Sequence, residues 1–271
     1  MPELPEVETI TKQLDKSVSG KKINEAEIFV PKIVKNSKKE FEKIIFDAKI
    51  KKIGRRAKLA IFELNNGWSL LIHLKLTGQL IFNGEKNKHT AVIFNFSDGT
   101  RLIFNDLRKF GYIKPIKTED LNDFFEKEKI GPEPLSEKFA LADFKNILQK
   151  RPKAKIKQFL MDPKSIAGIG NIYADEILFA SKIHPLRRNQ DLSTEEIKNI
   201  FKNIKKILAK AIELRGTSVE NYVDAKGQKG EFEKKLKVYG REGEKCVKCG
   251  GEVKRIKIGG RSAHFCPSCQ K

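Results

Sequence analysis

Two Cys-x2-Cys pairs constrain the fold of this chain more than any other feature. All four cysteines lie in the last 26 residues, at Cys246, Cys249, Cys266 and Cys269. Two such pairs with sixteen residues between them have the spacing of a four-thiolate tetrahedral zinc site. A closed set of four ligands is structural, so we expect one zinc ion that stabilises a finger and takes no part in chemistry. The alternative is four free or disulfide-bonded thiols.

The charge of the chain indicates an anionic partner. Its 55 Lys and Arg residues exceed its 35 Asp and Glu residues, which gives a net charge of +20. Nucleic acid, an anionic membrane and acidic protein would each suit this charge, and a merely solvated surface is the alternative. No apolar run approaches the roughly 20 residues of a membrane-spanning helix, and no signal peptide opens the chain. We therefore expect a soluble cytoplasmic protein.

The N-terminal half predicts one amphipathic helix followed by antiparallel strands. Apolar residues recur at Val7, Ile10, Leu14 and Val18, a helical spacing that ends at Gly20. Residues 22–116 form short apolar or alternating runs, as strands do. Two hairpins are predicted where Asn-Gly (residues 66–67) and Asp-Gly (residues 98–99) separate such runs. A β-sandwich or flattened barrel follows.

The rest of the chain predicts a linker, a helical region and a long loop. GPEPLSEKF (residues 131–139) has the prolines and glycine of a linker. Ser193 and Glu196 form a capping box before a long helix with an apolar stripe that reaches Ile212. The Gly-rich stretch that follows lacks periodicity, and a loop of this length is functional or disordered. We expect a multidomain α+β protein with domains at 1–133, 134–216 and 238–271, separated by a loop at 217–237.

These motifs together resemble the bacterial formamidopyrimidine-DNA glycosylases of the Fpg/Nei family. The resemblance runs from end to end, through PELPEVET, GRRAKLAIFEL, HLKLTGQL, NDLRKFG, GPEPL, GIGNIYADE and GGRSAHFCPSCQK. It implies a base-excision repair enzyme that flips a damaged purine out of duplex DNA. It also implies a β-sandwich domain, a helix-two-turns-helix domain and a zinc finger, with DNA in the cleft between two lobes and residues 217–237 capping the lesion. A monomer suits a single cleft.

The resemblance implies that Pro2, freed by removal of Met1, is the nucleophile of a combined glycosylase and AP lyase. An α-amino group has a reference pKa of about 7.7 to 8.0, against about 10.4 for lysine, so much more of it is unprotonated at neutral pH. Glu3 would act as the acid, and Glu6 would support the site. Both could instead be ordinary acidic residues of a first helical turn. Lys58 and Arg261 complete the implied catalytic set, through phosphate contacts and help in β- and δ-elimination.

The resemblance also assigns the contacts to DNA. Arg108 and Phe110 would fill the gap left by the extruded base, the arginine pairing with the orphaned cytosine. Leu76 stands where the family commonly has methionine, and Leu107 where it commonly has proline, so the probing of DNA is expected to differ. The expected phosphate contacts are Asn171 and Tyr239, with less direct contributions from His73, His89, Arg151 and Lys153. Asn171, after Gly168 and Gly170, is also expected to cap the helix that follows.

Two other functions stay open at this point. The related endonuclease VIII-type glycosylases share the N-terminal proline and glutamate, the lysine and the finger, but favour oxidised pyrimidines. Leu4, Arg108 and Phe110 favour the purine enzyme. A zinc-finger protein that binds damaged DNA without cutting it would need the charge and the finger, but it would not need Pro2, Glu3 and Lys58 together.

Overall fold

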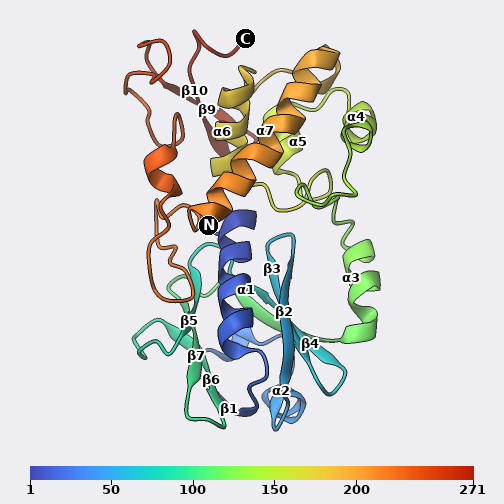
Figure 1. Cartoon of the computed structure of the whole chain (residues 1–271), viewed down its shortest axis with the longest axis vertical. Coiled ribbons are helices and arrows are strands. Elements are labelled where there is room, and N and C mark those ends of the chain that lie inside the picture. Colours follow the sequence, from blue (N-terminus) through green and yellow to red (C-terminus); the bar gives the residue numbers. More distant parts are fainter. The chain divides into compact units, whose positions relative to one another are not determined.

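The computed structural model describes all 271 residues, which divide into two compact units (Figure 1). The first consists of Met1–Glu128 and Ile212–Glu233, and the second of Lys129–Ala211 and Lys234–Lys271. The segment after the long helix α7 (Thr194–Glu213) therefore belongs largely to the first unit, and the cysteine-rich end belongs to the second. No helix is both long and apolar enough to cross a membrane.

Helix α1 (Leu4–Val18) opens the first unit and lies alongside its strands (Figure 1). Val7, Ile10, Leu14 and Val18 are all buried, which confirms the predicted apolar face. Eight strands follow: β1 (Ile23–Ile28), β2 (Ile50–Arg56), β3 (Leu59–Leu64), β4 (Trp68–His73), β5 (Gly78–Phe82), β6 (Thr90–Phe96), β7 (Arg101–Asp106) and β8 (Tyr112–Lys117).

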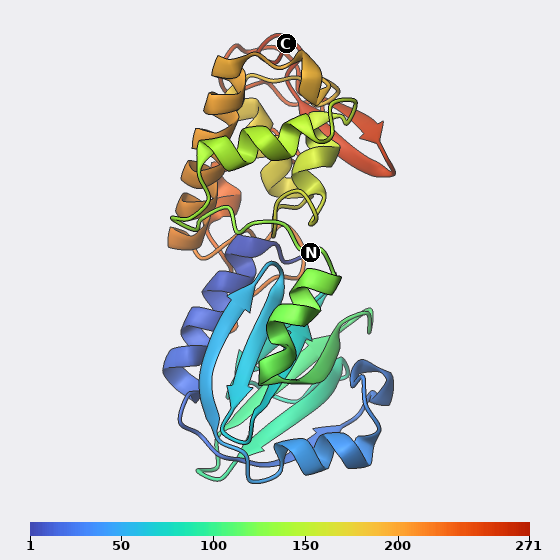
Figure 2. The same cartoon turned by 90° about the vertical axis from the view of Figure 1, so that its right-hand side faces the viewer.

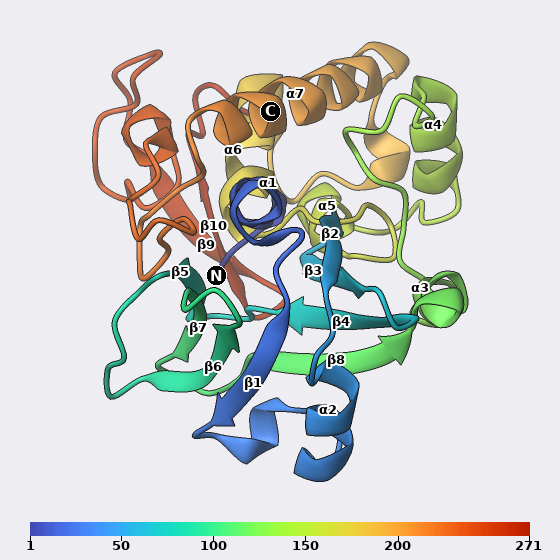
Figure 3. The same cartoon turned by 60° about the horizontal axis from the view of Figure 1, so that its bottom comes forward.

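These strands form two antiparallel four-stranded sheets, in the orders β1-β6-β7-β5 and β2-β3-β4-β8. Figure 3 shows the neighbours β4 and β8 running in opposite directions. The two predicted hairpins are present as β3–β4 and β6–β7, and their turns place Gly67 and Gly99 at φ near +80°, where a Cβ would be strained. The predicted sandwich is confirmed, and its core is closed by the apolar face of α1.

Strand β3 is buried at almost every position, instead of alternating, because both of its faces are covered. Helix α3 (Leu121–Lys127) lies against the outer face of the second sheet (Figure 2). Its Phe124 and Phe125 pack with Leu59, Ile61 and Leu71 in a separate apolar cluster.

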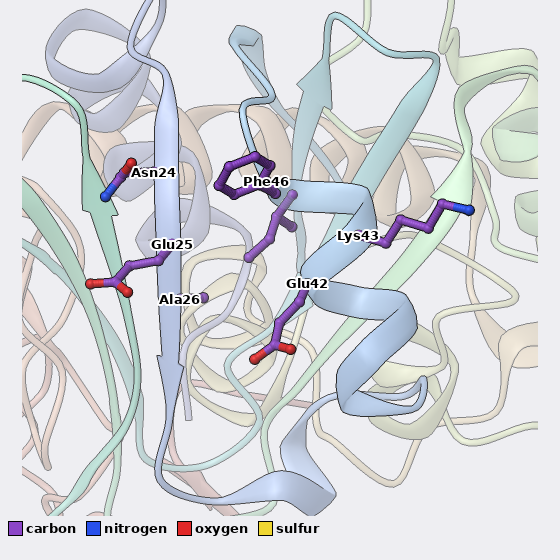
Figure 4. Close-up of a pocket in the computed structure, with 7 residues that line it drawn as sticks. Asn24, Glu25, Ala26, Glu42, Lys43 and Phe46 are labelled. Atoms are coloured by element: carbon purple, nitrogen blue, oxygen red, sulfur yellow. The ribbon is translucent and has the colours of Figure 1, made fainter.

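The first unit also contains a cavity of about 530 Å³ between β1 and α2 (Lys38–Ile45), lined in part by Glu25, Glu42 and Phe46 (Figure 4). None of the predicted site residues lines this cavity.

The second unit is helical, with a two-stranded finger. Its helices are α4 (Leu141–Gln149), α5 (Ile156–Met161), α6 (Asn171–Ser181) and most of α7, and its strands are β9 (Lys254–Ile258) and β10 (Arg261–Phe265). The predicted capping box before α7 is confirmed, because the Ser193 N–H donates to Glu196 Oε2 (2.7 Å) and the Glu196 N–H donates to Ser193 Oγ (3.2 Å). The buried Phe139 packs edge to face against Phe144, which is also buried, and against the partly buried Phe201. Short 3-10 turns complete the chain at Pro31–Ile33, Thr118–Asp120, Asn189–Asp191 and Phe232–Lys235.

Candidate active site

The chain begins at the buried end of α1. Pro2 and Glu3 precede the helix and are both buried, and the Glu3 side chain is only 2% exposed. The backbone N–H of Glu3 donates to Glu6 Oε2 at 2.8 Å. The other oxygen of Glu6, Oε1, accepts from the N–H of Thr217 at 2.8 Å. Glu6 therefore fixes the backbone at the second and third residues and links it to the beginning of the 217–237 segment.

The 217–237 segment lacks long helices and strands, as predicted, but its first part is fixed to the first unit. Asp224 is fully buried, and its carboxylate accepts from Gln13 Nε2 (3.0 Å) and from the N–H groups of Lys226 and Gln228. The Phe82 N–H of β5 donates to Ala225 O at 2.9 Å. These bonds hold this part of the segment against α1 and β5, and the segment as far as Glu233 belongs to the unit that contains Pro2.

Lys58 lies in the two-residue turn between β2 and β3, and Arg55 fixes that turn to α1. Ala57, the first turn residue, has φ of 54°. Arg55 Nη1 donates to Ala57 O (2.8 Å), while its Nε donates to Glu8 Oε2 on α1 (2.7 Å). Burial tends to raise the pKa of Glu8, but the hydrogen bond and charge of Arg55, together with Lys12, hold it below its ordinary value. Arg55 and Glu8 were not among the predicted site residues.

His73, at the end of β4, is neutral near pH 7. Burial, followed by the charges of Lys75 and Lys58, lowers its pKa from 6.5 to about 3. Its Nδ1 accepts the backbone N–H of Lys75 at 2.9 Å, so Nε2 carries the proton of the neutral ring. His73 can therefore offer an N–H to an anion but no positive charge. His89 is half-buried and immediately precedes β6.

One buried carboxylate joins the two loops that carry Leu76, Arg108 and Phe110. Asp106, at the end of β7, accepts from Thr77 Oγ1 (2.5 Å) and from the N–H groups of Arg108 (3.2 Å) and Gly111 (2.7 Å). Thr77 Oγ1 also accepts the Arg108 N–H at 3.0 Å.

The joined loops present an arginine and an aromatic ring to solvent. The Arg108 guanidinium lies 5.0 Å from the centre of the Phe110 ring, and that ring is 54% exposed. The sequence reasoning missed Thr77 and Asp106, although an Asp directly after an apolar strand is a signal for a braced turn.

Asn171 is the first residue of α6 in the second unit, and the prediction that it caps this helix is wrong. The N-cap is Gly170, and no side-chain cap is made. Gly170 has extended backbone angles (φ −131°, ψ −153°), so it is the last residue before the helix, and Asn171 already lies inside it. Asn171 Oδ1 is instead buried without a hydrogen-bond partner.

Arg261 and Tyr239 also lie in the second unit. Arg261 is exposed at the start of β10, after a turn in which Gly259 and Gly260 both have positive φ. The Tyr239 N–H donates to Glu176 Oε1 on α6 at 3.0 Å. Of the less direct candidates, Arg151 bonds Ser165 Oγ (2.6 Å) and Asp162, and Lys153 is exposed. The predicted site residues thus fall into two groups, one in each unit.

The four cysteines form a cluster that fits zinc. All four Sγ atoms lie within 4.8 Å of one another, with 3.9 Å between those of Cys246 and Cys269 and 3.4 Å between those of Cys249 and Cys266. Zinc bound tetrahedrally through bonds of about 2.3 Å would set its sulfurs about 3.8 Å apart. The N–H of Lys248 points at Cys246 Sγ (3.4 Å), as expected in a knuckle that binds metal through thiolates. The predicted zinc finger is confirmed.

Comparison with known proteins agrees with this arrangement along the whole chain. Residues 1–113 match the formamidopyrimidine-DNA glycosylase N-terminal domain, residues 130–223 the H2TH domain of the same enzymes, and residues 243–271 the zinc finger found in FPG and IleRS. The formamidopyrimidine-DNA glycosylases of Listeria innocua and Pelotomaculum thermopropionicum are 44% and 42% identical to the chain, which they match over at least 99% of each length.

Solved structures give the same answer for the fold. A variant of Lactococcus lactis FPG in complex with DNA containing Fapy-dG superposes with a TM-score of 0.94 at 39% identity, over 100% of both chains. The complex of Lactococcus lactis Fpg with DNA containing an abasic site gives 0.93 at 38% identity, over 99% of both. With the family domains covering most of the sequence, the chain belongs to the formamidopyrimidine-DNA glycosylase family.

Proposed function

We propose that this protein is a bifunctional DNA glycosylase and AP lyase that removes oxidised purines, 8-oxoguanine and formamidopyrimidines, from duplex DNA. The observation that carries the proposal is the buried start of α1, where Glu6 holds the backbone of Glu3 beside Pro2. A terminus fixed in this way is unusual, because chain ends are normally frayed. The DNA complexes of the Lactococcus lactis relatives support the choice of substrate.

The proposed chemistry begins when Met1 is removed, because only then is the nitrogen of Pro2 an amine. That nitrogen attacks C1′ of the damaged nucleotide, the bond from C1′ to the base breaks, and the base leaves with a proton. Glu3 supplies a proton to the sugar oxygen as the ring opens, which leaves an iminium between Pro2 and C1′. β-Elimination then releases the 3′ phosphate and δ-elimination the 5′ phosphate. Water finally hydrolyses the iminium product.

The remaining site residues take supporting roles in this proposal. Lys58 and Arg261 bind phosphates beside the lesion and assist the eliminations, and Asn171 and Tyr239 add to the phosphate grip. Arg108, Phe110 and Leu76 occupy the gap left in the duplex, which suits the exposed, braced loops that carry them. Residues 217–237 cap the extruded base.

We further propose that the enzyme acts as a monomer in the bacterial cytoplasm or nucleoid. The zinc ion, held by the four cysteines, would stabilise the finger. The proposed domain limits are 1–133, 134–216 and 238–271, joined by the 217–237 segment.

Borohydride trapping on abasic duplex DNA tests the nucleophile. The mature protein, with its first residue identified by mass analysis, should form a covalent complex that Pro2→Gly loses and Pro31→Gly keeps. Pro31 is a matched control because it lies in a separate 3-10 turn of the same unit. Trapping by a protein that fully retains Met1 would show that an amine other than that of Pro2 is the nucleophile. Failure of the unmodified protein to trap would favour a protein that binds damaged DNA without cutting it.

A second assay separates purine from pyrimidine specificity. Duplexes that contain 8-oxoguanine opposite cytosine should be cut faster than those with thymine glycol. The reverse order would assign the chain to the endonuclease VIII type. In the same assay, Glu3→Gln should stop base release but leave some cleavage of a preformed abasic site; excision of 8-oxoguanine at the parent rate would contradict the role given to Glu3.

A further inference from the structure

Asp175 joins three elements of the second unit through one buried carboxylate. It lies on α6, one turn after Asn171, and is 1% exposed. Its Oδ1 accepts from Lys157 Nζ on α5 at 2.6 Å. Its Oδ2 accepts from the backbone N–H of His264 on β10 at 2.9 Å and lies 3.1 Å from Nδ1 of the same residue. Lys157 also donates to the carbonyl of Ser262 on β10.

The neighbouring Glu176 fixes a second segment to the same helix. Its carboxylate accepts the N–H groups of Lys237, Val238 and Tyr239, each at 3.0 Å. Burial raises the pKa of Glu176, and the three amides oppose that rise. The two segments also meet each other, because the rings of Tyr239 and His264 pack edge to face with centres 5.0 Å apart.

The turn of the finger lies beside α5. A Cβ on Gly259 would lie 2.3 Å from Nε2 of Gln158, at the end of that flexible side chain, and the φ of +56° at Gly259 is one that other residues rarely adopt. Arg261 follows that turn by two residues and precedes Ser262 and His264, which are bonded to Lys157 and Asp175. The backbone that directly follows Arg261 is therefore fixed to the helices, while the Arg261 side chain is exposed.

A buried Lys–Asp pair adds little net stability, because desolvation of the two charges offsets their attraction, but it fixes geometry when every bond is made. We propose that Asp175 is a positioning residue for the DNA-cutting reaction. It fixes the hairpin that carries Arg261 to the helix that begins with Asn171, so that the distance between these two phosphate contacts stays constant. This inference rests on the proposed function, since it takes Arg261 and Asn171 as phosphate contacts. Asp175 itself touches no reacting atom.

The test uses the full zinc-loaded protein and a preformed abasic duplex at saturating enzyme. Asp175→Asn removes the carboxylate that neutralises the buried Lys157, so the double variant Asp175→Asn with Lys157→Gln accompanies it as a version that also lacks the lysine charge. Asp191→Asn, an exposed aspartate of the same unit, is the matched control. The measurements are zinc content, melting temperature, borohydride trapping and the ratio of δ- to β-elimination products.

We expect the double variant to keep one zinc and to form the Pro2 adduct, while its ratio of δ to β products falls at least about tenfold, because a displacement of about 1 Å can cost that much. Arg261→Ala added to the double variant should cause no further fall, since both changes would remove the same contact. An unchanged ratio, or a full additional loss from Arg261→Ala, would overturn the inference. Absence of trapping in the unmodified protein would instead refute the proposed function.

Discussion

Glu6 and Thr217 are 211 positions apart in the chain, yet the Thr217 N–H donates to Glu6 Oε1 at 2.8 Å. The backbone at Gly216 also lies close to this carboxylate, since a Cβ added to Gly216 would be 2.7 Å from Glu6 Oε1. Since Oε2 holds the amide of Glu3, one carboxylate sets both the start of the 217–237 segment and the residue beside Pro2. We therefore expect a change in either segment to affect the other.

Replacing Glu6 by glutamine should weaken both links. A glutamine has one acceptor oxygen and one NH2 group, so one of the two N–H donors would face another donor. We expect the free energy of unfolding to fall by about 1–3 kcal/mol, the cost of an unsatisfied buried group, and base release to slow. Denaturant unfolding and single-turnover excision measure the two effects. Glu126→Gln, exposed on α3, should change neither; parent values in Glu6→Gln would show that the carboxylate is dispensable.

Thr77→Val should loosen the loop that carries Arg108 while keeping the side-chain shape. The hydroxyl of Thr77 joins Asp106 to the Arg108 N–H, and valine cannot replace either bond. We expect a loss of about 1–3 kcal/mol of stability and slower excision of 8-oxoguanine, with less effect on an abasic site, which has no base to unstack. Thr100→Val, which removes a hydroxyl from the exposed β6–β7 turn, is the comparison. Equal slowing on both substrates would argue against a role in base extrusion.

The low pKa of His73 predicts acid sensitivity of the fold. The pKa of this group is about 3 in the folded protein and about 6.5 in an unfolded chain, so between these values only the unfolded chain binds the proton. Its contribution to stability is therefore complete above pH 6.5 and is lost as the pH falls toward 3, by at most about 1.4 kcal/mol per pH unit.

Unfolding measured from pH 7 to pH 4 checks this prediction. The slope of stability against pH should be shallower in His73→Gln than in the parent. An NMR titration of the four histidines gives an independent result. A His73 ring that titrates near pH 6.5 in the folded protein would contradict the assignment.

Removal of zinc should unfold the finger and leave the first unit folded. Cys246, Cys266 and Cys269 share a small apolar core with Phe179, Val238 and Val253, so loss of the metal would disturb the packing of the finger directly. We expect one zinc per chain, a lower melting temperature after chelation, and weaker DNA binding. Cys249→Ser should behave like the chelated protein. No bound zinc, or a thermal melt that chelators leave unchanged, would refute the metal site.

The sequence alone determined the features that depend on local pattern. The spacing of Cys246, Cys249, Cys266 and Cys269 predicts a zinc finger because each pair can bind metal within one tight turn. The apolar repeat of α1, the glycine turns of the two hairpins and the capping box before α7 likewise concern residues close in the chain. The motifs also sufficed to identify the family, since they recur in a fixed order.

Only the tertiary structure decided which buried polar groups hold the site residues in place. Glu6 with Thr217, Asp106 with Thr77, and Asp175 with His264 are partners from separate elements, and no periodicity relates them. Asn171 was misassigned as a cap because the Gly-x-Gly-Asn pattern does not say at which residue the helix begins. Burial decides these cases: once a carboxylate is taken out of water it must bond whatever donors the fold brings near it, and the chain sequence does not say which those are.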